Sequence, residues 1–220
     1  MIEAGTLTGV LHQRASSRAS QFAMSAILVV AGAALTALAA QVKVFLPFTP
    51  VPVTGQTFAV LLMGAGLGAR RGMASQGLYV TAGLAGLPVF VGGTHGYQVL
   101  WGPRGGYLLG FVLAAGLAGR LAESGWDRRP HSAIGGLILA NLVIYAAGLP
   151  WLWAFAGHAL RSSATIPASF RGSAITATLY AGFVPFVVGD ALKLLLAGSL
   201  LPGTWALIEK VQRADPTRGR

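Results

Sequence analysis

The sequence predicts an all-α membrane protein with six transmembrane helices, ordered apolar loops on the outer side and both termini in the cytoplasm. Two observations on composition support this class. Hydrophobic residues make up 54% of the 220-residue chain. Charged residues make up only 10%, whereas soluble domains average about 25%. In addition, the apolar residues come in long blocks, which are too many and too long for one water-soluble core.

A helix that crosses the hydrocarbon layer of a bilayer needs roughly 20 mostly apolar residues. The apolar blocks predict six spans, at residues 22–41, 54–68, 72–86, 106–123, 132–148 and 176–201. The second and third are short and rich in glycine. The chain holds 31 glycines, and small residues let membrane helices approach one another closely.

The first span has features of a cleavable signal peptide, because Arg14 and Arg18 precede an apolar run that ends in Ala37-Leu38-Ala39. However, the run extends over about 20 residues, whereas the apolar region of a signal peptide has about 7–15. Five further spans also follow it. We therefore expect an uncleaved first helix.

The distribution of basic residues predicts the topology. The chain carries 16 Lys and Arg against 6 Asp and Glu, a formal net charge of +10. With six spans and cytoplasmic ends, the inner segments hold Arg14, Arg18, Arg70, Arg71, Arg120, Arg128, Arg129, Lys210, Arg213, Arg218 and Arg220. The outer segments hold Lys43, Arg104, Arg161 and Arg171. Cations collect on the cytoplasmic side of membrane proteins, so this excess indicates topology rather than nucleic-acid binding.

No soluble domain interrupts the spans. We expect a cytoplasmic N-terminal segment at 1–21, a six-helix transmembrane substrate-binding domain at 22–201 and a basic cytoplasmic tail at 202–220.

Two outer loops are apolar and rich in proline or glycine, at residues 42–53 and 87–105. Prolines at 47, 50 and 52 exclude a helix from the first loop. Irregular backbone near a bilayer persists where it is buried in protein or lines a cavity. The two loops therefore predict a lid over an outward-facing pocket; the alternative is that they only connect helices. The third outer segment, 149–175, suggests no role.

Asp190 and Lys193 lie inside the last predicted span, where each charge costs about 2.5–3.5 kcal/mol on insertion scales. Their i, i+3 spacing puts them on one helix face. One interpretation is an internal ion pair that only neutralises itself. The other is that both side chains face a cavity and bind a ligand that has N–H donors and an acidic group.

Further polar residues lie at membrane depth. Thr54, Gln56 and Tyr107 adjoin the outer loops and are candidate ligand contacts, whereas interhelical hydrogen bonds are the ordinary role of Gln76, Tyr79, Asn141, Tyr145 and Tyr180. Trp101, at a loop edge, is either an interfacial anchor or an aromatic wall for an apolar ring.

Several kinds of site are not expected. The chain has no cysteine, and its four histidines match no metal-ligand spacing. No lysine lies in a phosphate-binding loop, and the zinc-protease and nucleophile-elbow motifs are missing from the sequence. We therefore expect neither a metal site nor an enzyme.

Five segments together resemble the BioY family of biotin transporters. They read PFTPVPVTGQTFAVLL at 47–62, GARRG at 68–72, GLPVF at 86–90, GPRGGYLLGF at 102–111 and GDALK at 189–193. In order, they cover nearly the whole chain from the first span to the last. The first segment is long and unusual enough to carry the resemblance by itself.

The resemblance implies a biotin-binding S component of an energy-coupling factor (ECF) transporter in the plasma membrane. Its partners would be biotin, a membrane coupling protein (the T component), a pair of ATPase subunits and lipid, with no bound cofactor and no nucleic acid. Ala33 and Ala37 match the small-residue face with which the family docks on the coupling protein. Arg104 departs from the small polar residue expected in the family pattern.

Under this hypothesis Asp190 accepts hydrogen bonds from the ureido N–H groups of biotin. Lys193, together with Arg104, balances the carboxylate or the ring carbonyl. Two alternatives remain, which are an ion-coupled secondary transporter with Asp190 as the coupling site, and a membrane enzyme or assembly factor that uses Asp190 and Lys193 for proton transfer.

Overall fold

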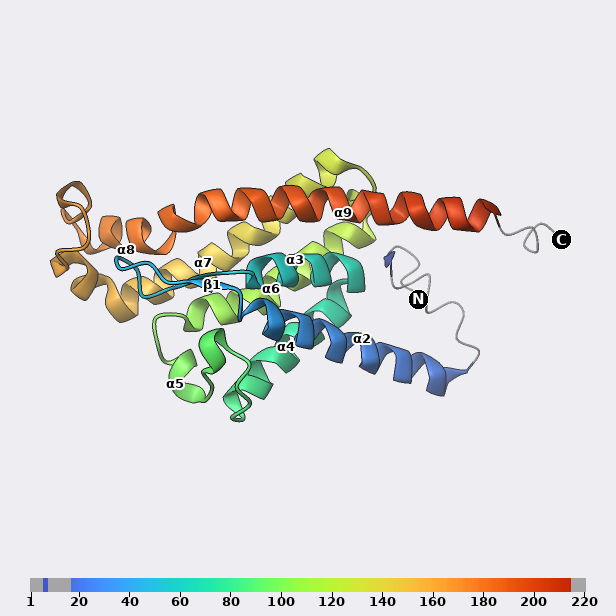
Figure 1. Cartoon of the computed structure of the whole chain (residues 1–220), viewed down its shortest axis with the longest axis horizontal. Helices are drawn as coiled ribbons and strands as arrows, with labels where there is room; N and C mark the ends of the chain where they lie inside the picture. The colour runs from blue at the N-terminus through green and yellow to red at the C-terminus, as the bar shows by residue number, and fades with distance from the viewer. Residues whose placement is uncertain (1–5, 8–16, 215–220) are drawn as a thin grey trace.

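Helices make up most of the computed structural model of the chain (Figure 1), which describes residues 6–7 and 17–214. The α-helices of this part are α2 (Arg18–Ala39), α3 (Gln56–Leu67), α4 (Ala69–Leu84), α5 (Tyr97–Leu100), α6 (Gly105–Glu123), α7 (Pro130–Ser162), α8 (Ala174–Gly182) and α9 (Val187–Ala214). Short 3-10 helices connect them: η1 (Val91–Gly93), η2 (Trp126–Arg128), η3 (Ala168–Phe170) and η4 (Val184–Phe186).

The all-α membrane class predicted from the sequence is confirmed. Four stretches of the described chain are long and apolar enough to cross a bilayer, namely α2, α6, α7 and the stretch Ala174–Ile208 that contains α8 and most of α9. The helix α3 is apolar but has only 12 residues. The helix α4 carries Arg70 and Arg71 in its first turn and is not among the four.

The helix α6 lies at the centre of the bundle and packs against α3, α4 and α7. Small residues allow this close packing. A Cβ atom on Gly119 would lie 2.3 Å from the backbone nitrogen of Ala69, and one on Gly64 would lie 2.6 Å from the carbonyl oxygen of Ala115. The glycine content of the sequence therefore corresponds to real backbone contacts between helices.

The long helices α2 and α9 lie on the outside of the bundle (Figure 1). The first turns of α2 and the last turns of α9 project beyond the other helices at the same end of the molecule. Large apolar side chains on both helices face outward, as Phe22 and Leu192 do. Such faces are typical of contact with lipid or with another membrane protein.

The first outer loop forms a small hairpin at the opposite end. Strand β1 (Lys43–Val44) pairs antiparallel with β2 (Val53–Thr54), with Lys43 opposite Thr54. The three prolines between or next to these strands keep the segment out of a helix, as the sequence predicts.

The second outer loop contains η1 and the four-residue helix α5. It bends at Gly92, Gly93 and Gly96, whose φ angles are 73°, 73° and 89°. These angles lie in the left-handed region, which glycine adopts without a steric penalty.

The helices differ from the predicted spans in three places. The helix α7 continues through Pro150 to Ser162 instead of ending at residue 148, and Leu152 beyond the proline is fully buried, so tertiary packing outweighs the lost backbone hydrogen bond. The stretch predicted as one span at 176–201 is two helices, because the chain breaks at η4, which contains Pro185. The helix α9 then continues to Ala214, so the predicted tail is helical over 202–214. Its last residues, 215–220, lie outside the described part, as do 1–5 and 8–16 of the predicted N-terminal segment.

Candidate ligand-binding site

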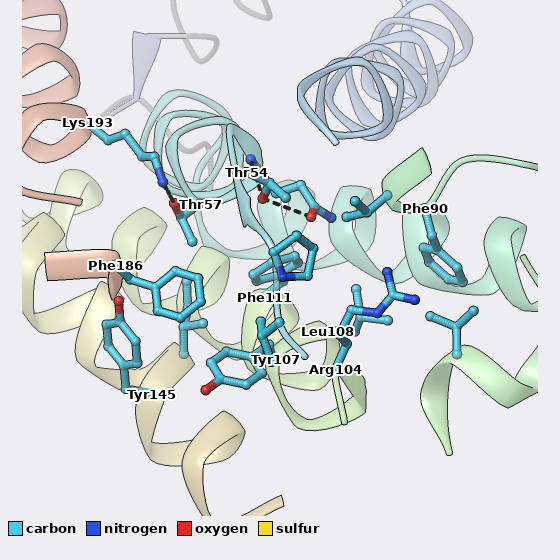
Figure 2. Close-up of a pocket in the computed structure, with 16 residues that line it drawn as sticks. Thr54, Thr57, Phe90, Arg104, Tyr107, Leu108, Phe111, Tyr145, Phe186 and Lys193 are labelled. Atoms are coloured by element: carbon cyan, nitrogen blue, oxygen red, sulfur yellow. Dashed lines mark hydrogen bonds between the residues drawn. The ribbon is translucent and has the colours of Figure 1, made fainter. Parts of the chain in front are cut away.

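A cavity lies beneath the hairpin, between α3, α5, α6, α7 and α9 (Figure 2). Apolar side chains make up most of its wall: Val51, Pro52, Phe90, Val91, Val99, Leu108, Phe111, Ile144 and Phe186. Polar side chains are fewer: Thr54, Gln56, Thr57, Arg104, Tyr107, Tyr145 and Lys193. An apolar cavity with a few polar groups suits a ligand that is itself part apolar and part polar.

Both predicted outer loops contribute to this wall. Val51 of the hairpin is 6% exposed, and Phe90 of the second loop is 1% exposed. The amide of Gln41 donates to the carbonyl oxygen of Phe90 at 3.2 Å, which joins the end of α2 to the second loop. The two loops are therefore packed parts of the site rather than free connections.

Tyr107 is held firmly on the first turn of α6. Its hydroxyl donates to the carbonyl oxygen of Gly182, at the end of α8, at 2.9 Å. Its ring fills the space beside Gly148 of α7, where a Cβ atom would lie 2.5 Å from the ring. Tyr107 therefore presents its ring to the cavity, and its hydroxyl proton is already used.

Lys193 lines the cavity from α9. Its ammonium group donates to Thr57 Oγ1 at 3.0 Å and to Asp190 Oδ1 at 3.1 Å. An ammonium group has three N–H donors, so one donor is left for a ligand when these two bonds are made. The ion pair also reduces the cost of placing a cation at this depth.

Asp190 does not line the cavity, because other side chains surround its carboxylate. In addition to Lys193, Oδ2 accepts from Asn141 Nδ2 at 2.9 Å and from the Tyr145 hydroxyl at 2.5 Å. Thr57 Oγ1 lies 3.4 Å from Oδ1. The side chain is 6% exposed. Asp190 therefore fixes the positions of Thr57, Tyr145 and Lys193, which do line the cavity.

A second polar chain runs along the start of α3. The hydroxyl of Thr54 donates to Gln56 Oε1 at 3.0 Å, and Gln56 Nε2 donates to the hydroxyl of Tyr79 at 2.7 Å. The ring of Tyr79 packs edge-on against Phe90, with 5.5 Å between centroids. These contacts define which way the Gln56 amide points.

Arg104 provides the other cation of the site, directly before α6. Its side chain is half-buried, and no ion pair or side-chain hydrogen bond joins it to another described residue. Burial lowers the pKa of the guanidinium, although arginine stays protonated at neutral pH. An unpaired, half-buried cation in an apolar wall is a natural partner for an anionic group of a ligand.

The structure brings together most of the predicted site residues. Thr54, Gln56, Arg104, Tyr107 and Lys193 all line one cavity (Figure 2). Asp190 lies one layer behind it. Trp101 does not reach it: its ring is 65% exposed and packs 6.0 Å from that of Trp151.

Two polar residues of the cavity wall, Thr57 and Tyr145, were not predicted as ligand contacts. Thr57 has no charge, and its only signal in the sequence is its place next to Gln56 in the longest of the recognised segments. Tyr145 was assigned to interhelical bonding, which is correct for its hydroxyl. Asn141 and Tyr145 are four residues apart in an otherwise apolar span, so they share a helix face, and this pair was the available signal.

Ala33 and Ala37 lie on the inner side of α2. Ala33 is 8% exposed and belongs to the core, while Ala37 is half-buried against it. The neighbouring Gly32 packs so closely on α4 that a Cβ atom would lie 2.5 Å from Ser75 Oγ. The outward side of the same helix carries Ala31 and Ala34.

The comparisons with known proteins agree with this fold and cavity. Residues 12–210 match the BioY family. The biotin transporter BioY of Thermotoga maritima is 39% identical over 153 residues, which are 69% of this chain and 79% of that protein. The probable biotin transporter BioY of Pyrococcus horikoshii is 36% identical over 166 residues, covering 76% of this chain and 86% of that protein.

One solved structure has the same fold. It is a crystal structure of the S-component for biotin from an ECF-type ABC transporter, with a TM-score of 0.67 at 20% identity, covering 85% of this chain and 93% of that chain. Because the family match spans all the helices that build the cavity, the chain belongs to the BioY family.

Proposed function

We propose that this chain binds biotin in the cavity beneath the hairpin and mediates its uptake as the substrate-specific subunit of an ECF-type transporter. The single observation that carries the proposal is the apolar cavity with a cation at each of two separate positions, Lys193 and Arg104. The named relatives are biotin transporters. The protein is then a multi-pass protein of the plasma membrane and not an enzyme.

The shape of biotin suits this arrangement. Biotin has a polar ureido ring at one end, a carboxylate at the other and an apolar body between them. Lys193 and Arg104 lie on opposite sides of the view in Figure 2, with Tyr107 and Phe111 between them. The proposal places the ureido ring near Lys193, Thr57 and Tyr145, and the carboxylate at Arg104.

Asp190 has a more specific part in the proposal. Asp190 can accept directly from the ureido N–H groups only if the ligand replaces Tyr145 or Thr57, which now donate to its carboxylate. With those bonds kept, the hydroxyl oxygen of Tyr145 would accept from the ureido group instead, and Asp190 would orient it. In both cases the carboxylate supports the ureido end of the pocket, and the sequence-based assignment of Asp190 to this end stays a prediction.

For the topology, the proposal has six passes with both ends in the cytoplasm: α2, α3, α4, α6, α7, and α8 with α9. The hairpin and the second loop are then extracytoplasmic, and residues 1–21 and 202–220 flank the transmembrane domain in the cytoplasm. In support, Arg70, Arg71 and Arg120 lie at the end of the bundle remote from the hairpin, as the positive-inside rule requires.

The energy for uptake would come from partners, a coupling protein and a pair of ATPase subunits, because this chain contains no phosphate-binding loop. The proposal places the coupling protein against α2, whose outer face is apolar. The sequence-based assignment of this contact to Ala33 and Ala37 stays a prediction.

Titration calorimetry of the purified protein with biotin tests the proposal. We expect saturable 1:1 binding, and weaker binding of the neutral biotin carboxamide, which lacks the anionic group. A protein that is folded by circular dichroism yet shows no saturable heat with biotin would refute the proposal.

A further inference from the structure

A second hollow adjoins the ligand cavity on the side of α5. It is open to the solvent and is lined by Gly93, Thr94, His95, Gln98, Gly102 and Pro103, together with Val99 and Arg104. The last two residues also line the inner cavity. The wall that separates the two spaces is therefore made in part by the Val99 and Arg104 side chains.

The backbone of this wall is held at both ends. Before α5, the amide of Gly96 donates to the carbonyl oxygen of Gly83 at 2.8 Å. After it, the indole of Trp151 donates to the carbonyl oxygen of Gly102 at 2.9 Å. Opening the wall by moving the loop would break these bonds. Moving the Arg104 side chain breaks no ion pair and no side-chain hydrogen bond to a described residue.

The character of the two spaces also differs. The hollow has the larger polar share of the two, with His95 and Gln98 exposed in its wall, whereas the inner cavity is mostly apolar. A ligand with an anionic end and an apolar body that enters through the hollow would therefore meet polar groups in the hollow first and apolar groups in the inner cavity last. Arg104 is the charged group that both spaces share.

We propose that this hollow is the access route of the ligand, a small carboxylate, and that Arg104 binds the carboxylate in the hollow and carries it into the inner cavity by a side-chain rotation. The hairpin stays closed during this step. The inference rests on the proposed function, since it assumes that a carboxylate ligand occupies the inner cavity.

Cysteine labelling tests the route, because the chain has no native cysteine. Gln98→Cys would be labelled with a bulky maleimide, and biotin association and dissociation would be followed by stopped-flow tryptophan fluorescence. An obstruction on the route slows entering and leaving alike, so we expect both rates to fall about tenfold or more with little change in Kd. His95→Cys, labelled in the same way, repeats the test if Gln98→Cys does not fold.

Two labelled controls complete the experiment. Ser162→Cys lies on an exposed part of α7 and should leave both rates unchanged. Phe45→Cys lies on the hairpin, where its side chain is 66% exposed, and it blocks the alternative route beneath the hairpin. Unchanged rates with labelled Gln98→Cys and His95→Cys, or slowing only with labelled Phe45→Cys, would overturn the inference. Lack of biotin binding by the unlabelled, folded protein would instead contradict the proposed function.

Discussion

At the scale of single residues, the site consists of two cations in different settings. Lys193 has an acidic partner and a hydroxyl partner, so its position is fixed before a ligand arrives. Arg104 has neither among the described residues. A fixed group such as Lys193 orients a ligand, whereas a cation with no partner among the described residues, such as Arg104, attracts an anionic group of the ligand. Substitutions in the two parts of the site should therefore affect ligand binding differently.

The first prediction concerns Asp190. We expect Asp190→Asn to weaken biotin binding by about tenfold or more, since a charge-assisted hydrogen bond is worth about 1.5–3 kcal/mol. The substitution removes the anion that holds Lys193 and Tyr145. Calorimetry measures the loss, and near-normal affinity would support an ion pair without a ligand role.

Tyr145→Phe separates the two possible acceptors of the ureido group. It removes the hydroxyl but keeps the ring and the carboxylate of Asp190. If Tyr145 accepts from the ligand, its loss should approach that of Asp190→Asn; if Asp190 accepts directly, Tyr145→Phe should be the milder change.

The second prediction concerns Arg104. Arg104→Gln should weaken binding of biotin by about tenfold, as expected for the loss of a charge-assisted contact, but leave binding of biotin carboxamide nearly unchanged. Arg161→Gln, an exposed arginine at the end of α7, is the matched control. Equal losses for both ligands would show that Arg104 supports the wall rather than the carboxylate.

At the scale of elements, the hairpin and the second loop cover the cavity while helices build its floor. Val51 of the hairpin and Phe90, Val91 and Val99 of the second loop are buried although the backbones of both loops are irregular. Irregular backbone is tolerated here because it is packed on protein.

The third prediction follows from this cover. Cysteines introduced at Thr49 of the hairpin and at Thr94 of the second loop should react more slowly with a soluble maleimide when biotin is bound. Ser124→Cys, which lies in the turn after α6, should react equally in both conditions. Equal reactivity at Thr49 and Thr94 with and without biotin would argue against a lid.

Another element-scale contact fastens α9 to the turn between α6 and α7. The indole of Trp205 donates to Asp127 Oδ2 at 2.6 Å, and the Arg128 guanidinium stacks on the Trp205 ring at 3.4 Å from its centroid. Asp127 is 2% exposed. Burial raises the pKa of this carboxyl above its ordinary value, outweighing the opposing effects of Trp205 and Arg128.

The fourth prediction is a pH dependence. Because the folded state raises the pKa of Asp127, it favours the protonated acid. This contribution to stability is fully present below the ordinary carboxyl pKa and is lost as the pH rises through the raised value. On acidification over this pH range, the melting temperature of the native protein in detergent should therefore rise more than that of Asp127→Asn. An identical pH dependence of the two proteins would contradict the prediction.

At the scale of the whole molecule, the cavity lies at one end, and the projecting ends of α2 and α9 lie at the other (Figure 1). The helix α2 is little buried along its length: only 17% of its most apolar stretch is buried in the bundle. A helix held so lightly leaves most of its surface for lipid or for a partner subunit.

The fifth prediction tests the docking face of α2. We expect Ala31→Trp with Ala34→Trp, on the outward side, to abolish co-purification with the coupling protein while biotin binding persists. The sequence-based prediction is the same outcome for Ala33→Trp with Ala37→Trp. Since Ala33 is buried, a larger side chain there would lower the free energy of unfolding by about 1–3 kcal/mol or more. A lowered melting temperature of the Ala33→Trp, Ala37→Trp variant would therefore show that this face of α2 belongs to the core. Co-purification of both folded pairs would exclude docking on α2.

The sequence by itself determined the membrane class, the extended hairpin and the residue types of the site. These follow from local chemistry: apolar blocks partition into lipid, prolines exclude helix, and charges inside an apolar span need a partner. Asp190 and Lys193 could be paired from their spacing alone because both belong to one helix.

Only the tertiary structure decided which side each helix turns toward its neighbours. Periodicity shows which residues share a face, but the rotation of a helix in the bundle depends on contacts far away in the sequence. Asn141 and Tyr145 reach Asp190 from another helix, so Asp190 lies behind the cavity wall instead of in it. The same reason explains why Trp101 points away from the cavity, why Ala33 faces the core, and why Arg104 borders two spaces.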